Sequence, residues 1–559
     1  MGFEAGVLAL LFNSIASGVL VTLFFRHFGA FKFHWIVWSN MLLSAIIPFV
    51  MVVGILPYDI SRCLFGKLST HSKLLHIILE FLYWVSFVLT WVINPLLVSY
   101  LRYPYSIGLK QRIWLTVREN LIFWGTILAV VVVGVTILLA THKMTFSNLF
   151  PLAISLANGY GLLVLCLTLG YGFVALPRKI WKEANPAITY LYCLQDISLQ
   201  TSNCATTIAD GKELVNHCYD ARRRLNGDAK EIWDKKGEKR LIRLKNLINE
   251  MPIPELSQKE GSKNKKIKKL KGTKWEEYSP LKLQGFLELL EDVCQNIEFT
   301  YSHVSDASKT ALAKLKLYNN ILNIPHLIFK RILAVLIFGL NLCCVWGEIS
   351  LMFSSKYSLF YIISHVSIPQ VVNIIFISTP ILAYLMVVGS WSLRYLRIGS
   401  FFRFIVGHTN SNTLNYFSII LCRLGPTIGF HYMQQIGAYD SEFQKVMGVM
   451  DVVVFIGTKW NTYAPVLLVG IMIIVSFEIV DRVMSACKAE IVTYDPSIMN
   501  PISLKKGEDV LCKLNPEARN MILRGFSYKV VLEHVNVFKK KEKTNRPLDV
   551  LLDDISEVI

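Results

Sequence analysis

Long apolar runs dominate this 559-residue chain. Nine of them stay apolar for about 20 residues or more, the length that a helix needs to cross a hydrocarbon core of roughly 30 Å. They lie at residues 3–25, 34–56, 76–100, 120–140, 150–176, 332–353, 369–391, 414–436 and 462–482. Strands of a membrane barrel would instead alternate apolar and polar residues. The runs therefore predict an all-α, polytopic membrane protein with about nine transmembrane helices.

The apolar runs also divide the chain into four parts. We predict transmembrane spans one to five in residues 1–176, a cytoplasmic segment at 177–331, spans six to nine in 332–482, and a cytoplasmic tail at 483–559. Composition agrees with this division, because 53% hydrophobic residues and a mean hydropathy of +0.44 exceed what a water-covered surface usually carries.

Lysine and arginine gather on one side of the predicted spans. With the N-terminus outside, sixteen basic residues fall in the inner loops and flanks and seven in the outer loops. Since cytoplasmic loops are enriched in these residues, we predict the N-terminus outside and the C-terminus in the cytoplasm. The net charge of +18 then suits an anionic cytoplasmic leaflet, so membrane lipids are expected partners and nucleic acid is not.

A 4-3 repeat of apolar and small residues, called the seam below, runs through the second half of the cytoplasmic segment. The seam comprises Leu283, Leu287, Leu290, Cys294, Ile297, Tyr301, Val304, Ser308, Ala311 and Leu315. A weaker repeat follows span five, at Ala187, Leu191, Leu194, Thr201, Ala205, Ile208, Val215 and Tyr219. Together the repeats predict an antiparallel coiled-coil hairpin. Its basic tip at residues 251–274 is expected to be disordered.

The seam has two interpretations. Its residues could pack only against the other arm of the hairpin, or they could recruit cytoplasmic or membrane protein partners. For the second interpretation the candidate contact residues are Leu283, Leu287, Leu290, Ile297, Val304 and Leu315. The sequence leaves both interpretations open, and it leaves a homo-oligomer open as well.

No catalytic signature accompanies this architecture. The sequence contains no P-loop and none of the motifs H-E-x-x-H, G-x-S-x-G or C-x-x-C, so it predicts no enzyme, no cofactor and no catalytic or metal site.

Polar residues inside the spans are the remaining candidates. Arg423 lies in span eight, where a charge costs at least ~2.5 kcal/mol, so it is expected to face the bundle interior or a wet cavity. Glu478, in span nine, is its first candidate partner, and Glu348 lies nearer the outer side. A buried Arg423–Glu478 pair could merely register two helices. Alternatively, these residues could form the polar wall of a substrate or lipid pathway.

Prolines and glycines within the spans predict bends and close helix contacts. The prolines are Pro48, Pro95, Pro380 and Pro426, and the glycines of span five are Gly159, Gly161, Gly170 and Gly172.

Several strings resemble a known family. They are Leu169-Gly170-Tyr171-Gly172-Phe173-Val174, Leu176-Pro177-Arg178 with Trp181, Leu421-Cys422-Arg423-Leu424-Gly425 and Met447-Gly448-Val449-Met450. In this order they are similar to the limb region 1 (lipocalin-receptor-like) membrane protein family, and within it to the domain-containing protein 2 branch. The resemblance implies nine spans, an outside N-terminus, a large loop between spans five and six, and no defined catalytic site.

The roles implied by this resemblance differ among family members. They are lipocalin uptake, lysosomal cobalamin export beside an ABC transporter, and modulation of receptor signalling. We therefore expect a non-enzymatic, multi-pass membrane receptor or signalling adaptor, in the plasma membrane rather than the endolysosomal membrane. The alternative is a transporter, or a transport accessory, for a small hydrophobic or vitamin-like ligand or a lipid.

Overall fold

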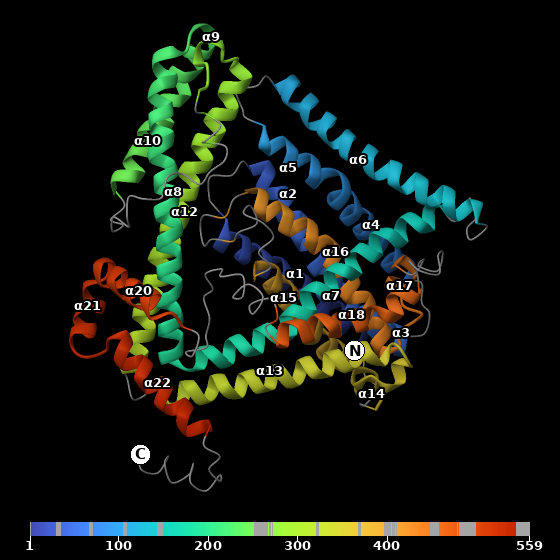
Figure 1. Ribbon diagram of the computed structural model, residues 1–559. Coiled ribbons are helices and arrows are strands. Elements are labelled where there is room, and N and C mark those ends of the chain that lie inside the picture. Colours follow the sequence, from blue (N-terminus) through green and yellow to red (C-terminus); the bar gives the residue numbers. More distant parts are fainter. Residues whose placement is uncertain are drawn as a thin grey trace. The chain divides into compact units, whose positions relative to one another are not determined.

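The computed structural model is helical in nearly all of the residues that it describes (Figure 1). These residues are 2–29, 35–65, 71–103, 109–141, 149–250, 267, 270, 272–319, 324–366, 371–395, 404, 409, 411–447, 458–477, 479 and 499–543. Among them no β-strand occurs, and one isolated bridge joins Gly29 to Thr409. The chain forms two compact units, a membrane unit (1–177 and 335–480) and a paired-helix unit (178–334 and 481–559).

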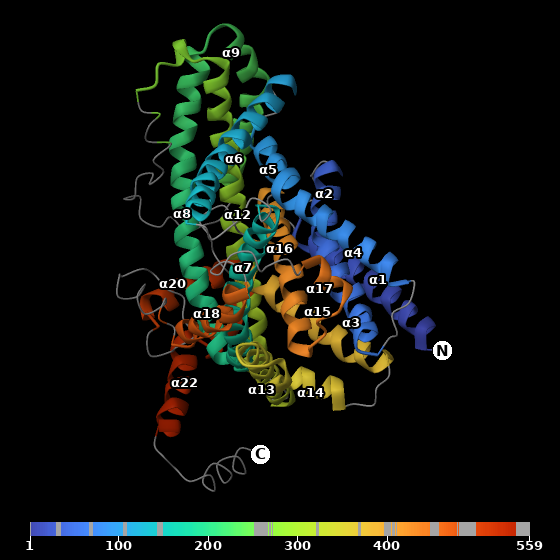
Figure 2. The same cartoon turned by 90° about the vertical axis from the view of Figure 1, so that its right-hand side faces the viewer.

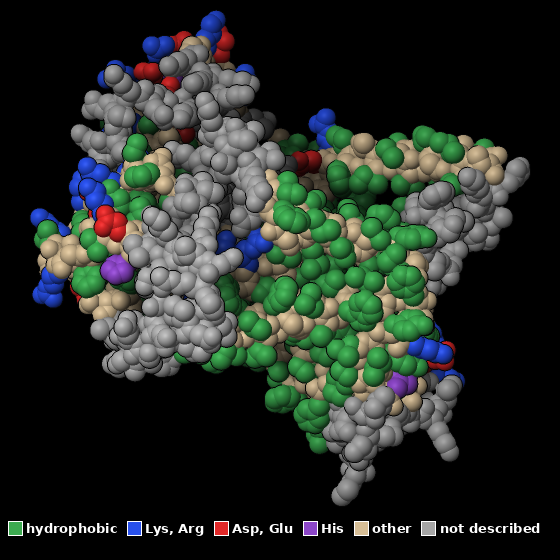
Figure 3. Space-filling view, turned by 60° about the horizontal axis from the view of Figure 1, so that its bottom comes forward, with side chains coloured by type: hydrophobic (Ala, Val, Ile, Leu, Met, Phe, Trp, Pro, Cys, Tyr) green, Lys and Arg blue, Asp and Glu red, His purple; other side chains and the backbone are tan. Residues whose placement is uncertain are grey.

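The membrane unit is a bundle of helices that includes most residues of α7 and α13. Its elements are α1 (Gly2–Phe28), α2 (Trp35–Phe49), η1 (Val50–Ile55), α3 (Leu56–Phe65), α4 (His71–Val88), η2 (Leu89–Ile93), α5 (Asn94–Arg102), α6 (Leu109–Ala140), α7 (Leu149–Ala184), α13 (Ile324–Ser350), η7 (Ser355–Tyr357), α14 (Leu359–Val366), α15 (Val371–Tyr395), α16 (Ser411–Ile436), α17 (Glu442–Met447) and α18 (Thr458–Ser476). Hydrophobic side chains cover much of its outer surface (Figure 3).

Seven helical stretches are long and apolar enough to cross a membrane, and they correspond to the first seven predicted spans. They are Gly6–Phe28, Trp35–Leu64, Lys73–Leu101, Leu109–Ala140, Asn158–Ala184, Leu327–Ser350 and Ile374–Leu393. Predicted span eight is the 26-residue helix α16, which is not among them. The ninth is represented by the shorter apolar stretch Thr462–Ser476 of α18. The chain is thus a helical membrane protein, and the total of nine spans stays a prediction.

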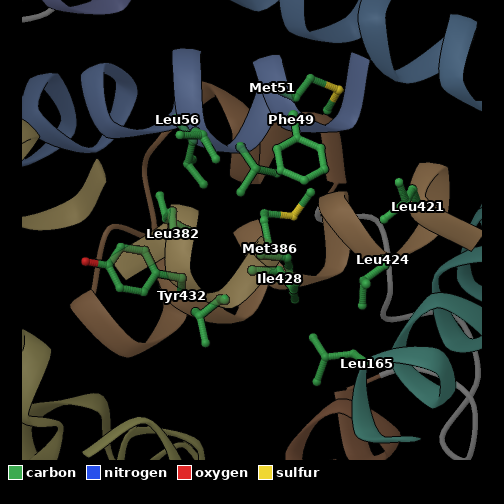
Figure 4. Close-up of a cluster of buried hydrophobic side chains, with 14 of the residues drawn as sticks. Phe49, Met51, Leu56, Leu165, Leu382, Met386, Leu421, Leu424, Ile428 and Tyr432 are labelled. Carbon is green, nitrogen blue, oxygen red and sulfur yellow. The ribbon is translucent and has the colours of Figure 1, made fainter. Parts of the chain in front are cut away.

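Helix α16 lies in the core of the membrane unit. Most of its residues are buried, and it packs against α2, η1 and α15 among other helices. In Figure 4, Leu424 and Ile428 of α16 lie close to Met386 of α15 and Phe49 of α2. Because its neighbours are protein rather than lipid, α16 can carry more polar residues than the other spans.

Two of the predicted prolines border wide, π-helical turns. Pro48 precedes η1, in which Leu56 N–H donates to Met51 O, and Pro95 follows η2, in which Asn94 N–H donates to Leu89 O. Such turns are a common adjustment where a helix ladder is interrupted.

Several glycines permit close helix contact in the core. A Cβ at Gly161 of α7 would lie 2.7 Å from Thr427 Cγ2, and one at Gly425 of α16 would lie 2.6 Å from Pro48 Cβ. The predicted packing role is confirmed for Gly161, and also for Gly170 and Gly172, where a Cβ would lie 3.0 Å from Ile471 Cγ2 and would collide with Ser392 Oγ, respectively. Gly159 is different, because a Cβ there would lie 3.9 Å from Trp460, an ordinary contact distance.

The paired-helix unit is built on two long helices, α8 (Pro186–Arg224) and α12 (Pro280–Asn319). Figures 1 and 2 show them side by side. The remaining elements are α9 (Gly227–Ile232), η4 (Trp233–Gly237), α10 (Glu238–Glu250), η5 (Trp275–Glu277), α20 (Pro501–Leu514), α21 (Pro516–Leu523) and α22 (Tyr528–Lys543).

Helices α8 and α12 run antiparallel. The start of α8, around Leu194, shares a core cluster with Leu315 near the end of α12, whereas Leu214 clusters with Leu290. Between these clusters, Thr207 Oγ1 and Thr300 Oγ1 lie 3.2 Å apart. A supercoiled geometry stays a prediction.

The seam is the buried face of α12. Every seam residue except the half-buried Tyr301 is at most 3% exposed. The register predicted for α8 is right near its start, and Ile208 and Val215 also pack against the buried cluster. At Ala205 and Tyr219 it is wrong by one residue: the preceding residues, Cys204 and Cys218, are fully buried, whereas Tyr219 is 37% exposed. Cysteine, glycine and alanine make up much of this buried face, so its apolar pattern in the sequence is weak.

Most of the predicted tip lies outside the described residues, including the lysines at positions 263, 265, 266, 268, 269 and 271. Of the described residues in this segment, Ile267 and Leu270 are buried in the cluster that also contains Trp233 and Trp275. Helix α10 is held to α12 by Arg243, which contacts Glu291 and Glu298 at 2.7 and 2.8 Å.

The described part of the C-terminal segment is folded against α8. Leu504 and Leu511 of α20 and Val531 of α22 are fully buried in a cluster with Tyr190 and Leu194. Lys506 Nζ donates to Ser202 Oγ at 2.7 Å, and Lys316 pairs with Glu517 at 2.7 Å. Residues 544–559 lie outside the described residues.

Glu508 gives this C-terminal contact an expected pH dependence. Burial raises the pKa of Glu508 above its ordinary value of 4.5, although its Oε1 accepts a 2.7 Å hydrogen bond from Tyr528 N–H. A raised pKa means that folding favours the protonated carboxyl, so its stabilising contribution is present below pH 4.5 and is lost as pH rises through the raised value.

We expect Glu508→Gln to slow hydrogen exchange in α20 at pH 7.5 relative to the wild type, because Gln keeps an oxygen for Tyr528 N–H without carrying a charge. The difference should vanish near pH 4.5. Faster exchange in the Gln variant at pH 7.5 would contradict the assignment.

Candidate functional site

Buried polar residues follow one another along α16 at intervals of four or eight positions. They are Asn415, Arg423, Thr427, His431 and Gln435, and each is at most 3% exposed. Neither polar atom of the Asn415 side chain has a hydrogen-bond partner among the described residues. The core of the membrane unit therefore contains a polar line within an otherwise apolar packing.

Arg423 is the charged member of this line. Its Cζ lies 5.0 Å from the centre of the Phe87 ring and 5.8 Å from that of Trp91. Its Nε and Nη2 have no hydrogen-bond partner among the described residues. The rings stabilise the cation, but they do not satisfy these two donors.

A side chain of α4 lies beside the guanidinium and is hydrogen-bonded to a side chain of α7. The Tyr83 hydroxyl is adjacent to it and donates to Asn158 Oδ1 at 3.4 Å. Asn158 Nδ2 in turn donates to Met447 O, also at 3.4 Å. Arg423 is thus enclosed by α4, η2 and α7 and has no carboxylate partner among the described residues.

The structure places Glu348 elsewhere. Its two carboxylate oxygens lie 2.8 Å from His431 Nδ1 and 2.9 Å from Gln435 Nε2. His431 is eight residues beyond Arg423, about 12 Å along a helix. The two polar candidates therefore belong to separate places in the core. Glu478, the predicted partner of Arg423, lies outside the described residues.

The described residues contain no group of His, Cys, Asp and Glu side chains that could hold a metal ion. In the paired-helix unit, burial raises the pKa of Cys193 and Cys294 to about 12 and that of Cys204 to about 11. Thiols with such pKa values stay protonated near neutrality, which makes them poor nucleophiles.

Comparison with known proteins identifies the family to which this chain belongs. The LMBR1-like membrane protein family matches residues 5–480, which contain the membrane unit and both long helices of the paired-helix unit. The chain belongs to this family. The predicted resemblance to limb region 1 proteins is thereby confirmed.

Curated relatives of this LMBR1-like chain carry two kinds of name. LMBR1 domain-containing protein 2 homolog A of Dictyostelium discoideum is 24% identical over 469 residues, 74% of this chain and 59% of that protein. A Drosophila melanogaster LMBR1 domain-containing protein 2 homolog is 24% identical over 77% of this chain and 67% of its own length. G-protein coupled receptor-associated protein LMBRD2 of Gallus gallus is 22% identical over 83% of this chain and 77% of its own length.

The match covers about three-fifths of the Dictyostelium protein. No solved structure matches this LMBR1-like chain.

Sequence reasoning identified Arg423 and Glu348 but missed His431 and Gln435. A spacing of four residues between Arg423, Thr427, His431 and Gln435 was the available signal, because residues four apart share a helix face. The aromatic residues around Arg423 had no comparable signal. They come from α4 and η2, more than 300 positions earlier in the chain.

Proposed function

We propose that this LMBR1-like chain is a non-enzymatic membrane adaptor that associates with a G-protein coupled receptor in the same membrane. The observation that carries the proposal is the name of its relatives in Gallus gallus and Caenorhabditis briggsae, G-protein coupled receptor-associated protein LMBRD2. The helical membrane unit supports it, since an adaptor of this kind needs surface within the lipid.

Helix α6 is the part of the membrane unit best suited to such a contact. None of the residues in its most apolar stretch is buried. Exposed side chains are Leu121, Ile122, Leu128, Val130, Val132, Val133 and Ile137. A helix with so little packing in its own chain has room for a helix of another membrane protein.

The start of α6 is nevertheless firmly held, so its position is defined. Arg112 is 2% exposed, and its Nε and Nη2 donate to Tyr100 O of α5 at 3.0 and 2.7 Å. Thr116 and Asn120, further along α6, are also buried. At 100° per residue, Gly125 lies on the opposite side of α6 from Thr116, and Gly134 lies on the same side as Thr116.

We place the receptor on the side of α6 that carries Gly125. A Cβ at Gly125 or at Gly134 would meet nothing within 4 Å, so leucine at either position fits the chain's own fold. Gly125→Leu should reduce co-purification of co-expressed, tagged G-protein coupled receptors roughly tenfold, because forcing a larger side chain into a close helix contact costs about 1–3 kcal/mol. Gly134→Leu is the matched control and should bind like the wild type.

The recovered receptor is quantified after purification of the full chain in a mild detergent. If no receptor of a broad panel co-purifies with the wild type, the adaptor proposal is wrong. If receptors bind both leucine variants equally well, α6 is not the contact.

The seam is less suited to partner recruitment. Its residues are covered by α8 and the helices beside it, so a partner would have to separate the pair before reaching them. We therefore assign any partner of the paired-helix unit to its outer surfaces.

A further inference from the structure

The two unpartnered donors of Arg423 form one edge of its guanidinium. Nε–H and Nη2–H point in parallel from this edge, and neither has a hydrogen-bond partner among the described residues. Two parallel N–H groups match the two oxygens of a carboxylate or phosphate. With its side chain 2% exposed, Arg423 pays a large desolvation cost unless an anion meets this edge.

The surroundings of this edge are aromatic. The centre of the Trp91 ring lies 5.8 Å from Arg423 Cζ, 5.8 Å from the ring centre of Trp124 of α6 and 6.0 Å from that of Tyr160 of α7. Trp91 is only half-buried, and its Nε1–H has no partner among the described residues. It thus offers a third unpartnered donor on a ring that lies beside the guanidinium.

The approach to Trp91 is apolar as well. On the same continuous stretch of α4 and η2, Phe81, Val88 and Val92 are 65%, 41% and 47% exposed. These side chains are expected to face lipid, because the stretch Lys73–Leu101 is long and apolar enough to span a membrane. A free inorganic anion would have to cross this layer, whereas an amphiphile can bring its own apolar body.

We propose that Arg423 binds the oxyanion of an amphiphile, a carboxylate or phosphate carried on an apolar body that contacts Phe87, Trp91 and Trp124. Nε–H and Nη2–H hold two oxygens of the head group, and Trp91 Nε1–H adds a third hydrogen bond. This site does not depend on the receptor association proposed above.

Binding is tested with the full chain in detergent by quenching of tryptophan fluorescence. The carboxylate probe is dibrominated stearate, its methyl ester is the neutral control, and phosphatidic acid with brominated chains is the phosphate probe. Stearate or phosphatidic acid should quench saturably and the ester should not. Which of the two acids quenches distinguishes a fatty acid from a phospholipid. The saturable quenching should be lost in the double variant Trp91→Phe/Trp124→Phe.

Arg423→Gln should weaken binding about 10- to 100-fold, the effect of losing a charged hydrogen-bonding group. Arg423→Lys keeps the charge but loses the two parallel N–H donors. Its affinity should lie between those of the wild type and Arg423→Gln. Arg62→Gln removes a cation of α3 that lies over the ring of Tyr58 in the same helix, and it should leave the affinity unchanged.

A protein carboxylate is the competing occupant of this edge, and Glu478 is the candidate. In that case Glu478→Gln lowers the melting temperature as much as Arg423→Gln does, and neither acid quenches saturably. That result overturns the proposal, as does saturable quenching that both Arg423 variants leave unchanged. The proposal expects Glu478→Gln to retain the affinity of the wild type for the acid.

Discussion

Replacing Leu290 and Ile297 together with aspartate is expected to unfold the paired-helix unit. Both side chains are fully buried in the cluster formed by α8, α10 and α12. Two carboxylates in this contact would lose their water without gaining partners, at a cost of about 5 kcal/mol or more. A loss of this size is comparable to the whole free energy of unfolding of a typical domain. Limited proteolysis of the full chain should show new cleavage within residues 178–334.

Gln295→Asp with Asn296→Asp is the matched control. These two positions are exposed on the same turn of α12, so the double variant adds the same two carboxylates without burying them. Its protease pattern should equal that of the wild type. An unchanged pattern in the Leu290/Ile297 variant would instead mean that the seam does not stabilise the pair in solution.

Gly507→Leu is expected to detach α20 from α8. A Cβ at Gly507 would collide with the backbone of Leu194, including its carbonyl oxygen. Backbone cannot move aside as a flexible side chain can, so the expected cost is about 3 kcal/mol or more, at the upper end for overpacking. Release of α20 would expose Leu504 and Leu511, which are fully buried in the wild type.

Hydrogen exchange of the full chain measures this release in two places, α20 and the residues of α8 around Leu194. Both should exchange faster in Gly507→Leu. Lys505→Leu adds the same side chain two positions earlier, at an exposed site of α20, and should exchange like the wild type. Equal exchange in the two leucine variants would contradict the close contact.

Features that depend on local periodicity could be predicted from the amino-acid sequence alone. Spans one to seven follow from runs of apolar residues, which a helix in lipid requires whatever its neighbours are. The seam follows from a 4-3 repeat because residues at that spacing share a face of one helix. The same reasoning misplaced the buried face of α8 by one residue at Ala205 and Tyr219, where the small residues Cys204 and Cys218 are buried instead.

Contacts between distant segments could not be predicted in this way and became visible in the three-dimensional fold. The C-terminal helices α20 and α22 pack on the start of α8, some 300 residues earlier, through short amphipathic faces that do not indicate their partner. Likewise, Glu348 meets His431 rather than Arg423, and Arg423 lies among the rings of α4 and η2. A polar residue in a span shows that a partner is needed. Which partner it meets depends on how helices far apart in the sequence pack together, and no local pattern records that.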